Sequence, residues 1–287
     1  MRLGYAIVLA WGLAVTPGAA LGCALELILA VDVSGSIDSN EFRLQTDGLA
    51  DAFEHPSLIS AVDELDGGLL VTMTHWSGTN RQRQMTHWRH LTDAASMVSF
   101  AAEVRKSGRA WRNFSTAIGE ALSHAANVSA TAPQTCKRRV IDVSGDGVSN
   151  EGRPPAMFSR ALAAEGYTVN GLVIRGADPD PVAHYRNEVI AGPGAFVEVA
   201  ASFDDYPRAI LRKLLREIDQ PLILSKNSLH LPRTRLPAQP PIVHHSYDWW
   251  LGGEASAWEV EITKTTTPFR NAPQYLIFIP SPQGLWR

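Results

Sequence analysis

Short apolar runs alternate with amphipathic stretches over most of this chain, and no other feature of the sequence constrains its fold as strongly. Each run is short and almost uninterrupted by polar residues, which indicates a strand buried on both faces. The runs occupy residues 25–31, 69–76, 138–144, 167–174 and 195–200. Between them, apolar residues three or four apart predict helices over residues 38–53, 93–106, 116–127, 156–165, 181–190 and 203–219. The alternation predicts an α/β fold with a doubly wound, mostly parallel, Rossmann-like sheet.

One connection departs from this pattern. Residues 74–76 read Thr-His-Trp, and the same triplet returns at residues 86–88 across a polar loop. This repeat predicts an antiparallel strand at one edge of the sheet. A strand face explains the aromatic and polar alternation, so His75, His87 and His90 receive no ligand role.

The two ends of the chain differ in composition from its middle. Arg2, the apolar stretch 5–15 and the small residues 17–20 predict an export signal over residues 1–22. The stretch is shorter than the ~20 residues that cross a bilayer, so we expect removal of the signal and no transmembrane segment afterwards. Residues 23–220 form the predicted domain. The proline- and tryptophan-containing tail, residues 221–287, is consistent with disorder, a small β appendage or a partner-binding segment.

Charge narrows the choice of partners. The chain has 26 basic and 29 acidic residues, a formal charge of −3, and no long run of one sign. Nothing in this balance attracts nucleic acid or an anionic membrane. We therefore expect an exported protein, periplasmic or secreted, that does not bind nucleic acid.

The chain has two cysteines, Cys23 and Cys136. Cys23 lies nine residues before Asp32, and Cys136 lies ten before Asp146. If these aspartates end neighbouring parallel strands, the two sulfurs meet at the opposite ends of the same strands. Two cysteines in an exported protein then predict one disulfide. A lipid-bearing Cys23 is the alternative, although Leu21 stands one residue closer to the cysteine than is usual in lipoprotein signals.

A cluster of oxygen-bearing side chains follows the first predicted strand. Asp32, Ser34 and Ser36 stand at alternate positions and offer one carboxylate and two hydroxyls. Gly35 lets the backbone turn tightly, so that these groups can converge. Mg²⁺ prefers such oxygen donors and tends to keep some of its waters.

A second acidic turn, with Asp146, follows the strand predicted over residues 138–144. In open α/β sheets, ligands bind beyond the carboxyl ends of the strands, where strand order reverses. If the two strands flank that point, Asp32 and Asp146 face one crevice, and Thr116 is the natural third contributor. Asp142 is a competing ligand. It lies inside the apolar run, where strand alternation points it away from the loop.

In this order and with these spacings, DVSGS, TAIG and SGDG resemble the metal-ion-dependent adhesion site of von Willebrand factor A domains, over about residues 24–219. The pattern DxSxS…T…D is carried by Asp32, Ser34, Ser36, Thr116 and Asp146. The resemblance implies that the serines bind a metal directly, that the other three bind it directly or through water, and that a partner's carboxylate completes the shell. One departure is Gly145, where the family commonly has Thr or Ser. The segments DVSGSID, VIDVSGDG and GPGAFV are similar to a bacterial secreted branch of uncharacterised function.

We therefore expect a binding module that uses Mg²⁺, or alternatively Mn²⁺ or Ca²⁺, to engage a protein partner presenting a carboxylate. Two carboxylates around a doubly charged ion leave the metal electrophilic, which suits binding of an acidic group. The expected protein is not an enzyme.

Two alternatives to this function stay open. One is a metal-dependent, phosphatase-like hydrolase with Asp32 as nucleophile. Such an enzyme usually needs a second acid two residues on, where Ser34 stands, and the serines lack a GxSxG context. The other is a scaffold in which the metal only stiffens the loops. This alternative needs the same ligands as the binding module does.

Overall fold

The computed structural model describes residues 22–219. The expectations for the export signal before residue 22 and for the tail over residues 221–287 therefore fall outside the described residues. Within 22–219, no helix is long and apolar enough to cross a membrane.

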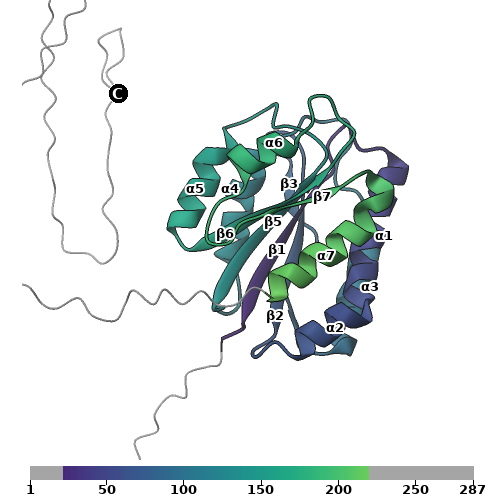
Figure 1. The fold of residues 1–287 in the computed structure, drawn as a ribbon, viewed down its shortest axis with the longest axis vertical. Helices are drawn as coiled ribbons and strands as arrows, with labels where there is room; N and C mark the ends of the chain where they lie inside the picture. Colours follow the sequence, from purple (N-terminus) through teal and green to yellow (C-terminus); the bar gives the residue numbers. More distant parts are fainter. Residues whose placement is uncertain (1–21, 220–287) are drawn as a thin grey trace, which may run out of the picture. The chain divides into compact units, whose positions relative to one another are not determined.

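The described residues form one twisted sheet with helices on both faces (Figure 1). The strand order is β3-β2-β1-β5-β6-β7, and β4 also pairs with β2. The parallel strands are β1 (Leu25–Asp32), β2 (Leu69–Trp76), β5 (Arg138–Gly145), β6 (Tyr167–Ile174) and β7 (Val197–Ala200). These agree closely with the five apolar runs, and the predicted fold class is confirmed.

Two helical layers enclose the sheet, and each has its own apolar core (Figure 1). One layer consists of α1 (Ser39–Glu54), α2 (Pro56–Asp63), α3 (Ala94–Lys106) and α7 (Tyr206–Asp219). The other consists of α4 (Ile118–Ser129), α5 (Pro155–Ala164), α6 (Val182–His184) and the π-helix Tyr185–Val189. A short 3-10 turn, Phe203–Asp205, precedes α7. Strand residues alternate between the two cores, which explains why the strands read as continuous apolar runs.

The short helix α2 has no counterpart among the predicted helices. It has only eight residues, of which Leu58 and Val62 are buried. Pro56 occupies its first turn, where a missing N–H is harmless, and the His55 ring accepts a hydrogen bond from the N–H of Ser57. Two buried residues are too few to produce a periodic signal.

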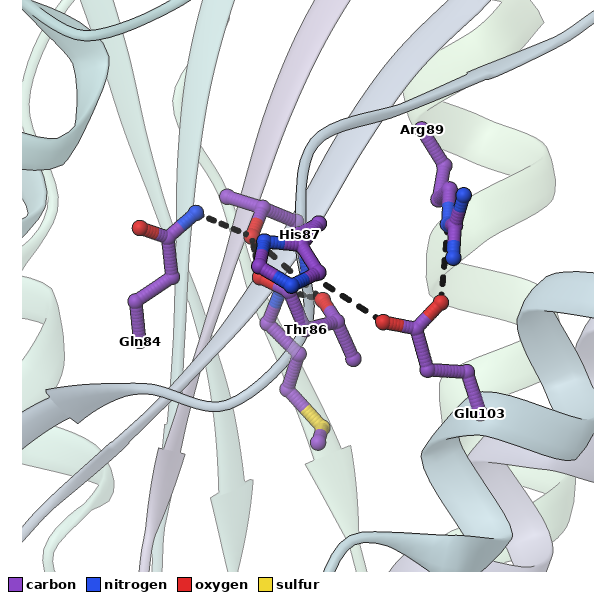
Figure 2. Close-up of polar contacts among 7 residues, drawn as sticks. Gln84, Thr86, His87, Arg89 and Glu103 are labelled. Carbon is purple, nitrogen blue, oxygen red and sulfur yellow. Dashed lines mark hydrogen bonds and ion pairs between the residues drawn. The ribbon is translucent and has the colours of Figure 1, made fainter.

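The antiparallel edge exists, but residues 86–88 are not its strand. Instead β3 (Gln82–Gln84) and β4 (Arg89–Leu91) pair separately with β2. Between them, the Thr86 hydroxyl accepts the N–H of Met73 at 2.8 Å, so a side chain replaces the expected backbone bond (Figure 2). Glu103 of α3 accepts the N–H of His87 and pairs with Arg89 at 2.8 Å (Figure 2). These contacts interrupt the strand.

The sheet has two halves, which meet where β1 lies beside β5. From β1 the chain continues outward to β2, whereas β5 leads to β6 and β7 on the other side. Strand order therefore reverses between the neighbouring strands β1 and β5, and loops leave the same end of both. At the opposite end, Cys23 and Cys136 form the predicted disulfide, with Cα atoms 4.4 Å apart. This bond uses the thiol that a lipid anchor would need.

Candidate metal site

Asp32 ends β1 and is fully buried at the point where strand order reverses. Its Oδ1 atom accepts the N–H of Ser34 at 2.7 Å, a bond that folds the loop back on the strand end. Its Oδ2 atom has no hydrogen-bond partner. A buried carboxylate oxygen without a partner is costly in a folded protein.

Ser36 connects this loop to the second acidic turn. The Ser36 hydroxyl donates to Asp146 Oδ1 at 2.8 Å and lies 3.3 Å from the Ser34 hydroxyl oxygen. Ser34 and Asp146 are buried, whereas Ser36 is exposed. Two segments 110 residues apart in sequence therefore share one hydrogen-bonded group of oxygens, open on one side to solvent.

The loop before α4 lies against the turn that contains Asp146. The Thr116 N–H donates to Asn150 Oδ1, and the Thr116 carbonyl accepts the N–H of Asn150, each at 2.9 Å. A Cβ atom on Gly147 would lie 3.9 Å from the Thr116 hydroxyl oxygen. Thr116 is buried and precedes α4, which begins at Ile118 rather than at the predicted residue 116. All five residues of the predicted pattern thus lie at one end of β1 and β5.

Gly35 allows a close approach between the first loop and residues 109–115. The N–H of Gly35 donates to the carbonyl of Phe114 at 2.8 Å, and a Cβ at position 35 would lie 3.2 Å from that same oxygen. The Arg109 guanidinium donates to the carbonyls of Val33 and Ser34, at 3.1 and 2.7 Å. Arg109 was not predicted from the sequence, because it is remote from the first loop along the chain and lies in an irregular segment.

Asp142, the competing ligand, faces the other layer. It forms an ion pair with the buried Lys213 of α7 at 2.7 Å. Lys213 also contacts Glu217 through a short ion pair of 2.5 Å. Asp142 therefore belongs to a separate interior cluster on the α7 side of the sheet, in the direction that strand alternation indicated.

The pKa values at the site follow from burial of acids beside one another. Burial and then the nearby charge of Asp146 raise the pKa of Asp32 to about 8, against the hydrogen bonds from Ser34. Burial also raises the pKa of Asp146, and the bond from Ser36 opposes the change. Among the described residues, no lysine or arginine forms an ion pair with either carboxyl group. The nearby Arg109 guanidinium lowers the pKa of Asp32 but forms no ion pair with it, so the site concentrates acidic oxygens without a directly paired cation.

The donor chemistry fits a hard divalent cation. Two carboxylates and three hydroxyls are all oxygen ligands, and the unpartnered Asp32 Oδ2 is an available acceptor. No group of three or more His, Cys, Asp or Glu side chains suited to a metal gathers anywhere in residues 22–219. Soft or imidazole-based coordination therefore has no candidate in that range, whereas a mixed set of carboxylates and hydroxyls does.

Gly145, the departure from the family pattern, has a structural reason. A Cβ atom there would lie 2.6 Å from the Tyr185 hydroxyl oxygen and 2.9 Å from Asp32 Oδ2. The same point is 3.3 Å from the buried Trp76 ring. A side chain at position 145 would therefore displace three neighbours. Neither Tyr185 nor Trp76 was identified from the sequence, where each reads as ordinary core.

The sequence matches a family model described as "Protein of unknown function (DUF1194)" over residues 22–222. No curated protein matches it. Among solved structures, proximal thread matrix protein 1 from the mussel byssus, with a zinc-occupied MIDAS motif, is 14% identical with a TM-score of 0.51. That match covers 69% of this chain and 46% of the other. A second structure of that protein is 16% identical with the same TM-score, covering 69% and 47%.

A von Willebrand factor type A structure from Catenulispora acidiphila is 20% identical, with a TM-score of 0.45, and covers 69% of this chain and 42% of the other. The chain thus spans less than half the length of the solved structures named here. At these identities, the likeness concerns the fold.

Proposed function

This chain belongs to the DUF1194 family and has a von Willebrand factor A fold, and from that premise we propose that it is an exported, Mg²⁺-dependent protein-binding module. Asp32, Ser34, Ser36, Thr116 and Asp146 hold the ion. The mature domain spans residues 23–220. It acts in the periplasm or outside the cell, and it is not an enzyme.

The observation that carries this proposal is that two neighbouring buried acids, Asp32 and Asp146, form no ion pair with a lysine or arginine of the described residues. Asp32 is fully buried with an unpartnered oxygen, and Asp146 is bridged to it through Ser36 and Ser34. A bound divalent cation would provide the positive charge that this group lacks. The exposed side, at Ser36, leaves room for a ligand from outside.

The protein's own residues set what the site can do. The bond from Ser34 N–H fixes one Asp32 oxygen, and Arg109 holds the carbonyls of the same loop. Mg²⁺ would supply an electrophilic centre with exchangeable water positions, which suits a partner carboxylate. The mussel protein, described with a zinc-occupied MIDAS motif, has the same fold and is consistent with metal use.

Calorimetric titration with Mg²⁺ tests the metal site. The mature protein is expected to bind with millimolar or tighter affinity, and Asp32→Ala is expected to abolish binding. Asp142→Asn is the matched control, since it removes a buried acid that faces the other layer, and it should retain binding. Equal binding by the wild type and Asp32→Ala would contradict the assignment.

A comparison of partner capture separates binding from a purely structural metal. Envelope extract is passed over immobilised wild type and Asp32→Ala, each in Mg²⁺ and in chelator. If the protein is a metal-dependent binding module, the wild type retains a partner in Mg²⁺ but not in chelator, and Asp32→Ala retains none in either. Equal capture by both proteins, together with lower stability of Asp32→Ala in Mg²⁺, would favour the scaffold. Metal-dependent turnover of phosphoesters that Asp32→Ala loses would favour the hydrolase.

A further inference from the structure

Tyr185 directs a buried hydroxyl at the candidate metal site from a different part of the chain. It begins the π-helix that follows α6, and its side chain is fully buried. Its hydroxyl has no hydrogen-bond partner. A Cβ atom on Gly145 would lie 2.6 Å from this hydroxyl and 2.9 Å from the unpartnered Asp32 Oδ2, so both atoms border the same small space.

Two glycines make room for this tyrosine. A Cβ on Gly145 would collide with its hydroxyl, and a Cβ on Gly171 of β6 would lie 2.7 Å from its ring. Gly145 and Gly171 leave space for the Tyr185 side chain because neither glycine has a side chain of its own. The π-helix adds a residue to the turn, a local irregularity that is common at functional sites.

The Tyr185 hydroxyl and Asp32 Oδ2 are a buried donor and a buried acceptor that lie close together, and neither has a hydrogen-bond partner. Each group alone is costly to bury, since it loses its bonds to water. Trp76 closes the space from the side, and its own N–H is already bonded to the Ala30 carbonyl at 3.0 Å. The Tyr185 hydroxyl is therefore the donor available to Asp32 Oδ2.

The two atoms are not hydrogen-bonded in this structure. We propose that Tyr185 is a positioning residue of the metal site: a small rotation of either side chain brings its hydroxyl into a hydrogen bond with Asp32 Oδ2 and orients that carboxylate. The hydroxyl thereby takes the place of the Thr or Ser that is absent at Gly145. This inference rests on the proposed function for its metal-binding consequence, whereas the proximity of the two side chains does not depend on any metal.

Tyr185→Phe tests the consequence, because it removes one oxygen and leaves the ring. Calorimetry with Mg²⁺ is expected to give an affinity about 10- to 100-fold weaker than wild type, as is typical when an orienting partner of a ligand is lost. Tyr167→Phe is the matched control. Its buried hydroxyl lies 2.7 Å from the Ser129 hydroxyl, on residues near the disulfide end of the sheet. That variant should bind Mg²⁺ as wild type does.

A double-mutant cycle with Tyr185→Phe and Asp32→Asn tests the contact itself, with urea unfolding measured in chelator. The two changes are expected to be non-additive by about twofold or more in the unfolding equilibrium constant. Additive changes together with an unaltered Mg²⁺ affinity of Tyr185→Phe would overturn the proposal. Failure of the wild type to bind Mg²⁺ would overturn the proposed function, while the cycle still decides the contact.

A second inference comes from the surface beside the site. On one side of the first loop, Arg81 stacks on Phe114 at 4.6 Å and Arg83 stacks on Trp111 at 5.1 Å. Arg112 donates to the Ser39 hydroxyl. We call these five residues the arginine rim: Arg81, Arg83, Trp111, Arg112 and Phe114.

The three rim arginines have no acid to neutralise them. Within residues 22–219, no carboxylate lies at salt-bridge distance from Arg81, Arg83 or Arg112. The rim is anchored to the site, because Gly35 N–H donates to the Phe114 carbonyl. Phe114 is 40% exposed, so its ring reaches the surface beside the site.

The geometry points to an acidic polypeptide segment as the partner, with one carboxylate at the metal and others on the arginine rim. This identification rests on the proposed function for the first contact only. Complementary charge at a rim accelerates encounter and makes binding sensitive to salt. The stacked aromatic rings hold the arginine heads in place, which reduces the ordering cost of binding.

An oligoglutamate peptide is the probe, titrated in Mg²⁺ at increasing NaCl. Wild type is expected to bind, with affinity falling as salt rises, and Arg83→Ala and Arg112→Ala each to weaken binding about two- to fivefold. Arg212→Ala is the control, since its arginine is already paired with Glu198. No peptide binding by wild type, or equal losses in rim and control variants, would overturn the proposal. Peptide binding that is weakened in the rim variants but persists in chelator would support the arginine rim as a binding surface. The same result would contradict the metal-dependent function.

Discussion

Two groups of buried acids lie on opposite faces of the sheet, and only one of them has a cation within ion-pair distance. Asp142 and Glu217 share Lys213, a fully buried cation on α7 within 2.7 Å of both. Within residues 22–219, no lysine or arginine lies at ion-pair distance from Asp32 or Asp146, although the positive charge of Arg109 lowers the pKa of Asp32. The interior cluster contains its own counter-ion. For the site at the loops, we propose that an ion from solution supplies the positive charge.

Substitution of Lys213 is expected to have the largest effect on stability. Lys213→Met leaves two acids buried without a cation, and the free energy of unfolding is expected to fall by about 3–5 kcal/mol. Denaturant titration measures the loss, with the exposed pair variant Arg212→Ala as control, expected to lose at most about 1 kcal/mol. A loss no greater than in the control would show that the interior acids do not need the lysine.

Removal of Mg²⁺ should lower the free energy of unfolding through Asp32 and Asp146, and not through the cluster around Lys213. At Mg²⁺ of about 100 times the dissociation constant, wild type is expected to gain about 2.7 kcal/mol of stability over its chelated form. Asp146→Asn should gain nothing from Mg²⁺. In chelator it should be at least as stable as wild type, since it removes one of two neighbouring buried acids. A variant still stabilised by Mg²⁺, measured by the same unfolding experiment, would break the comparison.

The pH dependence of the unfolding free energy should show a smaller effect, which comes from Asp142. Burial, opposed by Lys213, raises the pKa of Asp142 from 3.8 to about 7 in the folded protein. Between these values the native state holds a proton that the unfolded chain has lost, so this contribution to stability is present below about pH 4 and disappears as the pH rises to about 7. Asp142→Asn should make the downward slope of the unfolding free energy measured in chelator shallower, and the part that comes from the raised pKa of Asp32 should remain. An unchanged slope relative to the exposed control Asp63→Asn would contradict this account.

The loops of the candidate site could be located from the sequence because their residues are local. Asp32, Ser34 and Ser36 lie within five residues, and the position of each loop followed from counting strands. The sheet was predictable for a similar reason, since strands buried on both faces leave long apolar runs. Asp142 was correctly separated from the loop by strand alternation.

Residues that act through tertiary contact could not be found in this way. Lys213 reads as one more basic residue on an amphipathic helix, and only its approach to Asp142 makes it a buried counter-ion. Tyr185 reads as core, and the sole sequence signal of its role is the unexpected Gly145. The interruption at Thr86 depends on a side chain taking a backbone bond, which no periodicity records.

The most direct test of the central claim is a crystal structure of the mature protein grown with Mn²⁺, a stand-in for Mg²⁺ with a measurable anomalous signal. The account predicts one anomalous peak among the oxygens of Asp32, Ser34, Ser36, Thr116 and Asp146, and none between Asp142 and Glu217. Anomalous density absent from the Asp32 and Asp146 carboxylates, or found at the interior cluster instead, would contradict it.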